Sequence, residues 1–238
     1  MISLYRYILM LTLQVTIGCY SCFSQKSAAA VLADFEKNYT TNDSYDLALV
    51  YTMYKGFTGH KITEQYKGSL YKEGTTFRMT AMENEVVQFD KKQLNIDHQT
   101  KQIYIRNKVK EVENPTHIVR LLQYYAPVTM QTKADRYIIE MAIKNSQLPL
   151  PFQKMRLHIH KETKILLKQT LFFAQKQAFV TTDGNELDTA RLEIEIEEQA
   201  LEKRVSPITL SDYVITGNSG YIAADNYKNY NIIDQTNR

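Results

Sequence analysis

The stretch that decides the fold runs from Leu47 to Ile105 and reads LALVYTMYKGFTGHKITEQYKGSLYKEGTTFRMTAMENEVVQFDKKQLNIDHQTKQIYI. Apolar and polar side chains alternate along its first three segments, and a period of two residues indicates β-strands with one apolar face. The apolar faces carry Leu47, Leu49, Tyr51 and Met53 in the first segment, Ile62, Tyr66 and Leu70 in the second, and Phe77, Met79 and Ala81 in the third. Three shorter strands follow at 86–89, 94–96 and 103–105, separated by polar turns. Closely spaced strands with polar turns predict an antiparallel meander.

Helical patterns flank this meander. Before it, residues 27–39 place Val31, Phe35 and Tyr39 at a spacing of four, which gives a helix with one apolar face. After it, Asn114-Pro115 predicts the start of a second helix, which ends at Ala126-Pro127. Alternation then resumes in segments that predict further strands, at 137–143, 155–159, 165–173, 179–182 and 192–196. The tail from 211 to 238 holds short tyrosine-rich pieces around a turn at 217–220.

The predicted fold class is therefore α+β, with about eleven strands in one large, curled antiparallel sheet, an unclosed β-barrel whose concave face is covered by helices. The helices either fill that face as an ordinary core or cover a hydrophobic cavity as a lid, and periodicity does not separate the two. We expect a signal peptide at 1–24, the sheet domain at 25–210, and a C-terminal extension at 211–238 that packs on the same domain.

The first 24 residues indicate export. Arg6 precedes an apolar run of twelve residues from Tyr7 to Gly18, which is shorter than the ~20 residues of a membrane-spanning helix and fits a secretory signal. Cleavage after Ser24 would give a periplasmic protein without cysteine. Two alternatives stay open: a lipobox at 16–19 that would make Cys19 an acylated first residue of an outer-membrane lipoprotein, and an uncleaved signal anchor.

Composition and motifs argue against several function classes. A net charge of +3 in 238 residues is too small to indicate a nucleic-acid partner. The chain has no phosphate-binding glycine loop, no G-x-S-x-G and no H-E-x-x-H. We therefore expect no enzyme activity, no catalytic residues and no cofactor.

Three polar clusters are interpreted as structural. His158 and His160 alternate with apolar residues, which is typical of a solvated strand face, so we expect no metal site there. The alternating carboxylates Glu193, Glu195 and Glu197 predict an exposed acidic strand face that discourages edge pairing. The segment 183–186 (DGNE) predicts a hairpin turn.

The order of these features resembles the periplasmic outer-membrane lipoprotein carrier (LolA-like) family. The motifs that carry the resemblance are AVLADF at 30–35, LVYTM at 49–53, KGSLY at 67–71, FRM at 77–79, FDKKQL at 89–94 and NP at 114–115. The resemblance covers roughly residues 28–198.

The resemblance implies a concave apolar face that shields the acyl chains of lipoproteins, or another lipid, and passes them towards the outer membrane. Its implied partners are an acylated cargo, an inner-membrane release complex and an outer-membrane acceptor, and we expect a monomer. An acceptor of the same fold with an acylated Cys19, or a non-carrier interaction or sensor module, are the alternatives. The implied cavity residues are Leu49, Tyr51, Met53, Tyr66, Leu70, Phe77 and Met79. The implied lid residues are Val31, Phe35, Ile118, Leu121 and Leu122.

Overall fold

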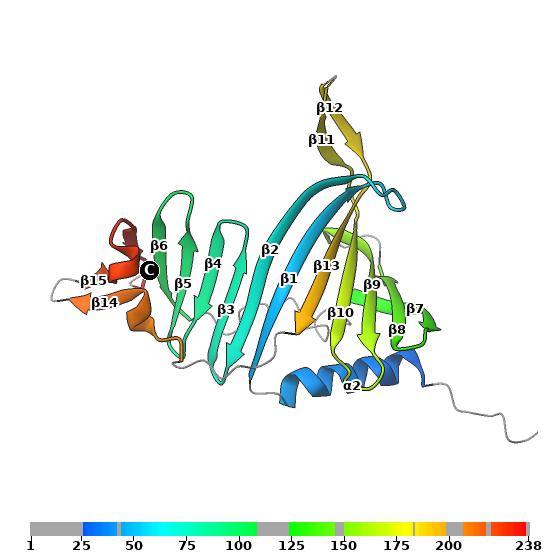
Figure 1. The fold of residues 1–238 in the computed structure, drawn as a ribbon, viewed down its shortest axis with the longest axis horizontal. Helices are drawn as coiled ribbons and strands as arrows, with labels where there is room; N and C mark the ends of the chain where they lie inside the picture. Colours follow the sequence, from blue (N-terminus) through cyan, green and yellow to red (C-terminus); the bar gives the residue numbers. More distant parts are fainter. Residues whose placement is uncertain are drawn as a thin grey trace, which may run out of the picture.

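The computed structural model describes residues 26–41, 44–108, 124–145, 150–182, 184–198, 207–217 and 220–236. A single open sheet of twelve strands dominates it (Figure 1). From one edge to the other, the strands are β16 (Asn231–Asp234), β6 (Gln102–Asn107), β5 (Lys92–Asp97), β4 (Asn84–Gln88), β3 (Thr76–Ala81), β2 (Ile62–Glu73), β1 (Ser44–Lys55), β13 (Ala190–Glu198), β10 (Leu166–Phe173), β9 (Phe152–His160), β8 (Arg136–Ile143) and β7 (Tyr125–Thr132).

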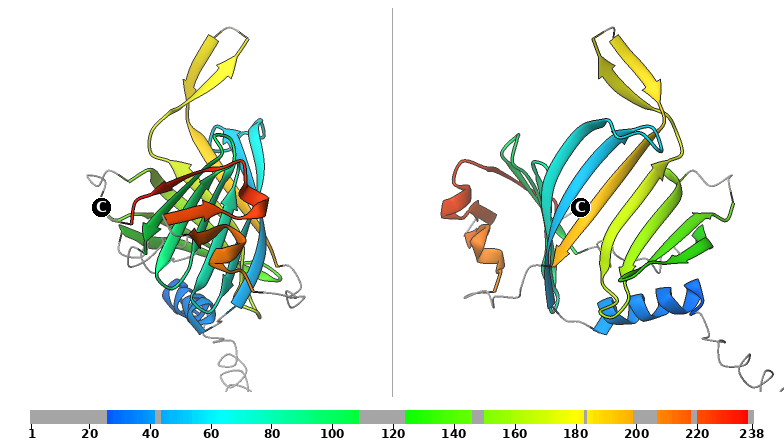
Figure 2. Two further views of the ribbon diagram at one scale, coloured as in Figure 1. Left: turned by 90° about the vertical axis from the view of Figure 1, so that its left-hand side faces the viewer. Right: turned by 45° about the vertical axis from the view of Figure 1, so that its right-hand side comes forward.

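The strands pair antiparallel with one exception, because β16 runs parallel to β6. The large unclosed sheet predicted from the sequence is thus confirmed. It has twelve strands rather than about eleven, and the returning β16 makes it mixed rather than purely antiparallel. The sheet curls, so that it has a concave and a convex face (Figure 2).

The helix α2 (Ala28–Thr41) lies across one end of the strands on the concave side (Figures 1 and 2). Its start is capped by Ser27, whose Oγ accepts a hydrogen bond of 3.2 Å from the Ala30 backbone N–H. The apolar stripe of α2 is buried: Val31, Leu32 and Phe35 are at most 1% exposed.

The prediction that helices cover the concave face is only partly met. Within the described residues, α2 is the one α-helix of more than a single turn, and it covers one end of that face. Residues 114–123 of the second predicted helix lie outside the described chain. The predicted helix end at Ala126-Pro127 is about two residues late, because Tyr124 is helical and β7 already begins at Tyr125. Pro127 is tolerated there because β7 is the last strand of the sheet, where a missing N–H costs no hydrogen bond to a further strand.

Two hydrophobic cores lie on opposite faces of this one sheet. The concave core joins α2 to β1, β2, β8, β9, β10 and β13, and it includes Phe35, Leu49, Leu70, Ile139, Met155 and Leu157. The convex core lies at the other end of the sheet, over β4, β5 and β6, and its members from the sheet are Tyr71, Val87, Leu94, Ile96, Ile103 and Ile105.

The C-terminal segment 207–236 covers the convex core. It contains the 3₁₀ turns η1 (Leu210–Asp212) and η2 (Asp225–Tyr227) and the hairpin of β14 (Val214–Gly217) and β15 (Gly220–Ala223). Ile208, Tyr213 and Val214 are buried against the sheet, and the segment lies over the outside of β4–β6 (Figure 2, left). The last strand, β16, then joins the sheet edge next to β6.

The strands β11 (Gln177–Thr181) and β12 (Gly184–Asp188) form a separate hairpin that projects from the ends of β10 and β13 (Figure 1). The hairpin predicted around 183–186 is therefore correct, although Gly184 and Glu186 belong to β12 itself. Among the described residues, no helix combines the length and the apolar character that a membrane span requires.

Candidate functional site

The concave face forms an apolar trough whose rows follow from strand register. Leu49, Tyr51 and Met53 of β1 stand opposite Ile196, Ile194 and Leu192 of β13. On the other side of β1, Leu47 pairs with Leu70 of β2, which in turn pairs with Met79 of β3. Directly opposed residues in a sheet point to the same face. The same apolar face thus continues across at least four neighbouring strands.

Burial varies over the surface of this trough. On β9, Leu157 and Ile159 are 0% exposed, whereas Ile196 on β13 keeps 9% exposure. Further along the same face, Tyr51 and Met53 of β1 are only half-buried. The trough is therefore closed over β8 and β9 and also at Leu49 and Leu70, and it opens at Tyr51 and Met53 of β1 and at Met79 of β3.

Tyr51 lies on the floor of the open part. Burial raises the pKa of its hydroxyl. Its ring packs over Gly68 of the neighbouring strand, where an added Cβ would come within 2.9 Å of the ring and 2.4 Å of the Thr80 carbonyl oxygen. Glycine at position 68 therefore lets β2 and β3 approach closely and leaves room for the Tyr51 ring.

The structure places the seven predicted cavity residues on this concave face. Five of them belong to one packed cluster: Leu49, Leu70 and Phe77 as buried members, and Tyr51 and Met79 as half-buried neighbours. Met53 and Tyr66 lie on the same face, but outside that cluster, and both are half-buried. The Tyr66 hydroxyl donates a hydrogen bond to Glu64.

Of the predicted lid residues, Val31 and Phe35 lie on α2 and are buried in the concave core. The other three, Ile118, Leu121 and Leu122, lie outside the described residues. Their role as a lid stays a prediction.

Sequence reasoning missed the far wall of the trough, which β8, β9, β10 and β13 supply. In the predicted strand 192–196, Leu192, Ile194 and Ile196 alternate with glutamates and so share one face, but their position beside β1 joins residues about 140 apart in the chain. Periodicity predicts which residues share a face and says nothing of which strands become neighbours.

Beyond β3, the concave face becomes polar. Register places Gln88, Gln93 and Arg106 in one row across β4, β5 and β6, with Val86, Asn95 and Tyr104 in the next row, where Val86 is the apolar member. Gln88 and Gln93 are buried, at 7% and 3% exposure. The amide Nε2 of Gln93 donates a 2.9 Å hydrogen bond to Oδ1 of Asn95. An apolar trough and a polar wall thus share one concave surface.

The convex face behind the trough carries ion pairs. Lys168 lies 2.5 Å from Glu193 and 3.1 Å from Glu195, and Arg191 Nε lies 2.9 Å from Glu193. The interpretation of the β13 glutamates as a device against edge pairing is wrong, because β13 lies between β1 and β10 in the middle of the sheet. Glu193 keeps 15% of its side-chain surface exposed. Burial opposes its ionisation, but hydrogen bonds from Lys168 and Arg191 outweigh burial and lower its pKa.

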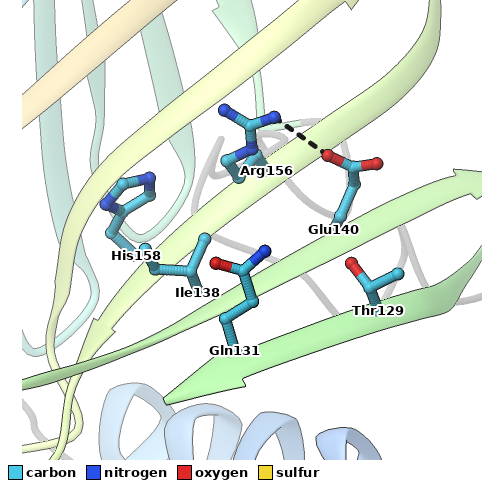
Figure 3. A pocket seen from close by; sticks show the side chains of 6 residues that line it. All are labelled: Thr129, Gln131, Ile138, Glu140, Arg156 and His158. Atoms are coloured by element: carbon cyan, nitrogen blue, oxygen red, sulfur yellow. Dashed lines mark hydrogen bonds and ion pairs between the residues drawn. The ribbon is translucent and has the colours of Figure 1, made fainter. Parts of the chain in front are cut away.

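A small polar pocket of about 210 Å³ also opens on the convex face, over β7, β8 and β9 (Figure 3). It is lined by Thr129, Gln131, Ile138, Glu140, Arg156 and His158. Glu140 accepts a 3.0 Å hydrogen bond from Arg156 and lies 3.1 Å from Lys154 Nζ. These two cations outweigh burial and hold the pKa of Glu140 below its usual value.

His158 is half-buried in this pocket rather than fully solvated. Burial lowers the pKa of its imidazole, and the positive charges of Lys168, Arg136 and Arg156 lower it further. His160 points the same way but hydrogen bonds to Thr163 in the following turn. In the part of the chain that the structure describes, no three histidine, cysteine, aspartate or glutamate side chains gather in a way that could hold a metal ion.

Comparison with known proteins gives no matching family model and no matching curated protein. Similar solved structures include an uncharacterized conserved protein from Thermus thermophilus, with 15% identity and a TM-score of 0.44, covering 88% of this chain and 100% of that one. A LolA superfamily protein from Nitrosomonas europaea matches with 10% identity and a TM-score of 0.29, covering 77% and 99%. LprF from Mycobacterium bovis matches with 8% identity and a TM-score of 0.34, covering 76% and 93%. A LolA superfamily member is thus among the structures that this chain resembles, and at these identities the likeness concerns the fold alone.

Proposed function

We propose that the chain binds acyl chains on its concave face and acts as a periplasmic carrier of lipoproteins or another lipid. The observation that carries the proposal is the open part of the trough. Tyr51 and Met53 of β1, Met79 of β3 and Leu192 of β13 share one apolar face, and all four are half-buried although their neighbours are packed. If this surface served only as a core, burying it completely would make the folded chain more stable.

The energetics of transfer support a shielded site of this kind. Burying an acyl chain contributes ~0.8 kcal/mol per methylene, so a chain of about fifteen carbons gains on the order of 12 kcal/mol at most. A molecule with such chains does not cross water unaided. Half-buried methionines are suited to binding such a molecule, because their flexible thioethers adapt to acyl chains of different shape.

The test is a titration of a fluorescent fatty acid into the folded protein and two matched variants. Met53→Glu introduces a charge on the concave face of β1, and Val50→Glu introduces the same charge on the convex face of the same strand. We expect the first variant to weaken binding at least tenfold and the second to leave it unchanged. Absence of binding by the wild-type protein would contradict the proposal.

The periplasmic location is part of the same proposal and rests on the signal peptide that the sequence predicts at residues 1–24. The intact mass of the exported protein tests it. A mature chain that begins at Gln25 supports a soluble carrier, whereas an acylated Cys19 at the N-terminus would instead support a membrane-attached acceptor of the same fold.

A further inference from the structure

The polar wall of the concave face contains an arginine with an unsatisfied donor. Arg106 lies on β6 opposite Gln93 of β5, and its side chain is half-buried. Its Nε is fully buried and has no hydrogen-bond partner among the described residues. Leaving a buried donor unsatisfied costs free energy, and more so on a charged group. The guanidinium is therefore a donor group that a ligand could satisfy.

The described groups around Arg106 offer donors rather than a counter-charge. The Oδ1 of Asn95 accepts a hydrogen bond from Gln93, so the Nδ2 of Asn95 can donate to a ligand. The carboxylate on the same face of β5 is Asp97, whose Oδ1 accepts the backbone N–H groups of Gln99 and Thr100 in the following turn. Neither Asn95 nor Asp97 neutralises the charge of Arg106. The guanidinium of Arg106 and the amide of Asn95 can therefore donate to an acceptor-rich, anionic group.

This wall continues directly from the apolar trough. Phe77 of β3 lies in the same row as Gln88, Gln93 and Arg106. Three strand spacings of ~4.8 Å separate Phe77 from Arg106, roughly 14 Å in all. In the neighbouring row, Met79 of β3 is two strands from Asn95 of β5, with Val86 of β4 between them. A chain that lies across the trough towards β3 would thus bring its head group to β5 and β6.

We propose that the ligand is an anionic amphiphile, whose chain lies on the apolar rows of β1 to β3 and whose carboxylate or phosphate head is held by Arg106 and Asn95. This rests on the proposed acyl-binding function and adds the chemistry of the head group to it. The charge of the head group determines which amphiphile is preferred, because the apolar rows contact chains of equal length in the same way whether the head group is charged or not.

The experiment compares decyl phosphate, decanol and decyltrimethylammonium by isothermal titration calorimetry. We expect decyl phosphate to bind about tenfold more tightly than decanol, the gain from one hydrogen bond to a charged group. Decyltrimethylammonium should bind more weakly than decanol. Arg106→Gln should remove the difference between decyl phosphate and decanol without changing the affinity for decanol, and Arg106→Lys should restore part of it.

Arg78→Gln is the matched control. Arg78 is also half-buried, and its Nε has no partner among the described residues, but it lies on the convex face, 5.9 Å from the Tyr71 ring centroid. Its loss should leave the preference for decyl phosphate intact. Thermal melting of each variant shows that it is folded before it is titrated.

The outcomes separate the two proposals. If the decyl compounds bind without a preference for the anion, or if Arg106→Gln keeps the preference, the head-group site is wrong and acyl binding stands. If no decyl compound binds, acyl binding fails and the head-group site fails with it. Inorganic phosphate alone should not displace decyl phosphate at millimolar concentration; displacement would show a site for free anions instead of an amphiphile.

Discussion

The two ends of the sheet bury opposite faces, although the strands between them are continuous. At the β8–β9 end, Leu157 and Met155 point to the concave side and pack under α2, while their convex side carries ion pairs. At the β4–β6 end, Leu94 and Ile103 point to the convex side and pack under the C-terminal segment, while the concave side is polar.

The change of side takes place on β2. Leu70 and Tyr71 are adjacent and point to opposite faces, and both are buried, at 0% and 5% exposure. Leu70 belongs to the concave core and Tyr71 to the convex one. A sheet that changes its buried side in this way leaves an apolar surface facing a polar one across its concavity. That is the arrangement an amphiphilic ligand needs.

The largest effect is expected from removing the C-terminal segment. A chain that ends at residue 206 would expose Val87, Leu94, Ile96, Ile103 and Ile105, which are at most 1% exposed now. Each such side chain contributes ~1.5–3 kcal/mol when buried, and together this approaches the ~5–15 kcal/mol stability of a typical protein. We expect amide protection from hydrogen exchange to be lost in β4–β6 and retained in β8 and β9. Equal protection of both ends would show that the two cores are not separate.

The second prediction compares one buried tyrosine from each core. Tyr213 donates a 2.8 Å hydrogen bond to Glu85 in the convex core, and Tyr125 donates a 2.5 Å hydrogen bond to the Phe152 carbonyl in the concave core. Bonds to charged groups contribute more than bonds to neutral ones. Tyr213→Phe should therefore lower the free energy of unfolding by ~1.5–3 kcal/mol and Tyr125→Phe by ~0.5–1.5 kcal/mol. Urea denaturation measures both free energies, and the reverse order would contradict this ranking of the two hydrogen bonds.

Gly68→Ala probes the strand where the two ends join. The new Cβ would lie 2.4 Å from the Thr80 carbonyl oxygen of β3, a backbone atom that cannot move away alone. Overpacking of this kind costs ~1–3 kcal/mol. The control Lys67→Ala, at the next residue and exposed on the convex side, should stay within ~0.5 kcal/mol of wild type. A neutral Gly68→Ala in urea denaturation would show that β2 and β3 can separate freely.

A smaller, pH-dependent effect is expected at His158 behind the trough. Burial and the charge of Lys168 lower its pKa in the folded state. The unfolded chain therefore takes up the proton first, so stability is complete above about pH 6.5 and falls as the pH drops below that value. His158→Gln should remove the loss of stability that His158 causes between pH 8 and pH 5, as measured by the shift in Tm. The exposed His60→Gln serves as control, and an unchanged pH profile in His158→Gln would rule out the effect.

Local pattern was enough to predict the sheet and the side of the trough that lies on β1 to β3. The alternation of Leu49, Tyr51 and Met53 correctly predicts a shared face, as does the spacing of Val31 and Phe35 on α2. The edge strand β7 was missed because Pro127 indicates a helix stop until its position at the sheet edge is known.

The buried side of each strand could not be predicted in the same way. In β5, Gln93 and Asn95 alternate with Leu94 and Ile96, and the pattern is the same whether the apolar side faces the concavity or the C-terminal segment. That choice depends on contacts with residues more than 100 positions away, such as Tyr213. The periodic pattern therefore could not predict the polar wall or the position of Arg106 in it.

The most direct test of the account is to locate the bound chain with a spin-labelled fatty acid, using NMR signals of the labelled protein. The label broadens signals of nuclei close to it. Acyl binding on the open trough predicts strong broadening at Tyr51, Met53, Met79 and Leu192, with Leu94 and Ile103 on the convex side unaffected. Broadening centred on the convex side or on the C-terminal segment, or no broadening at all, would contradict the assignment of the concave face as the binding surface.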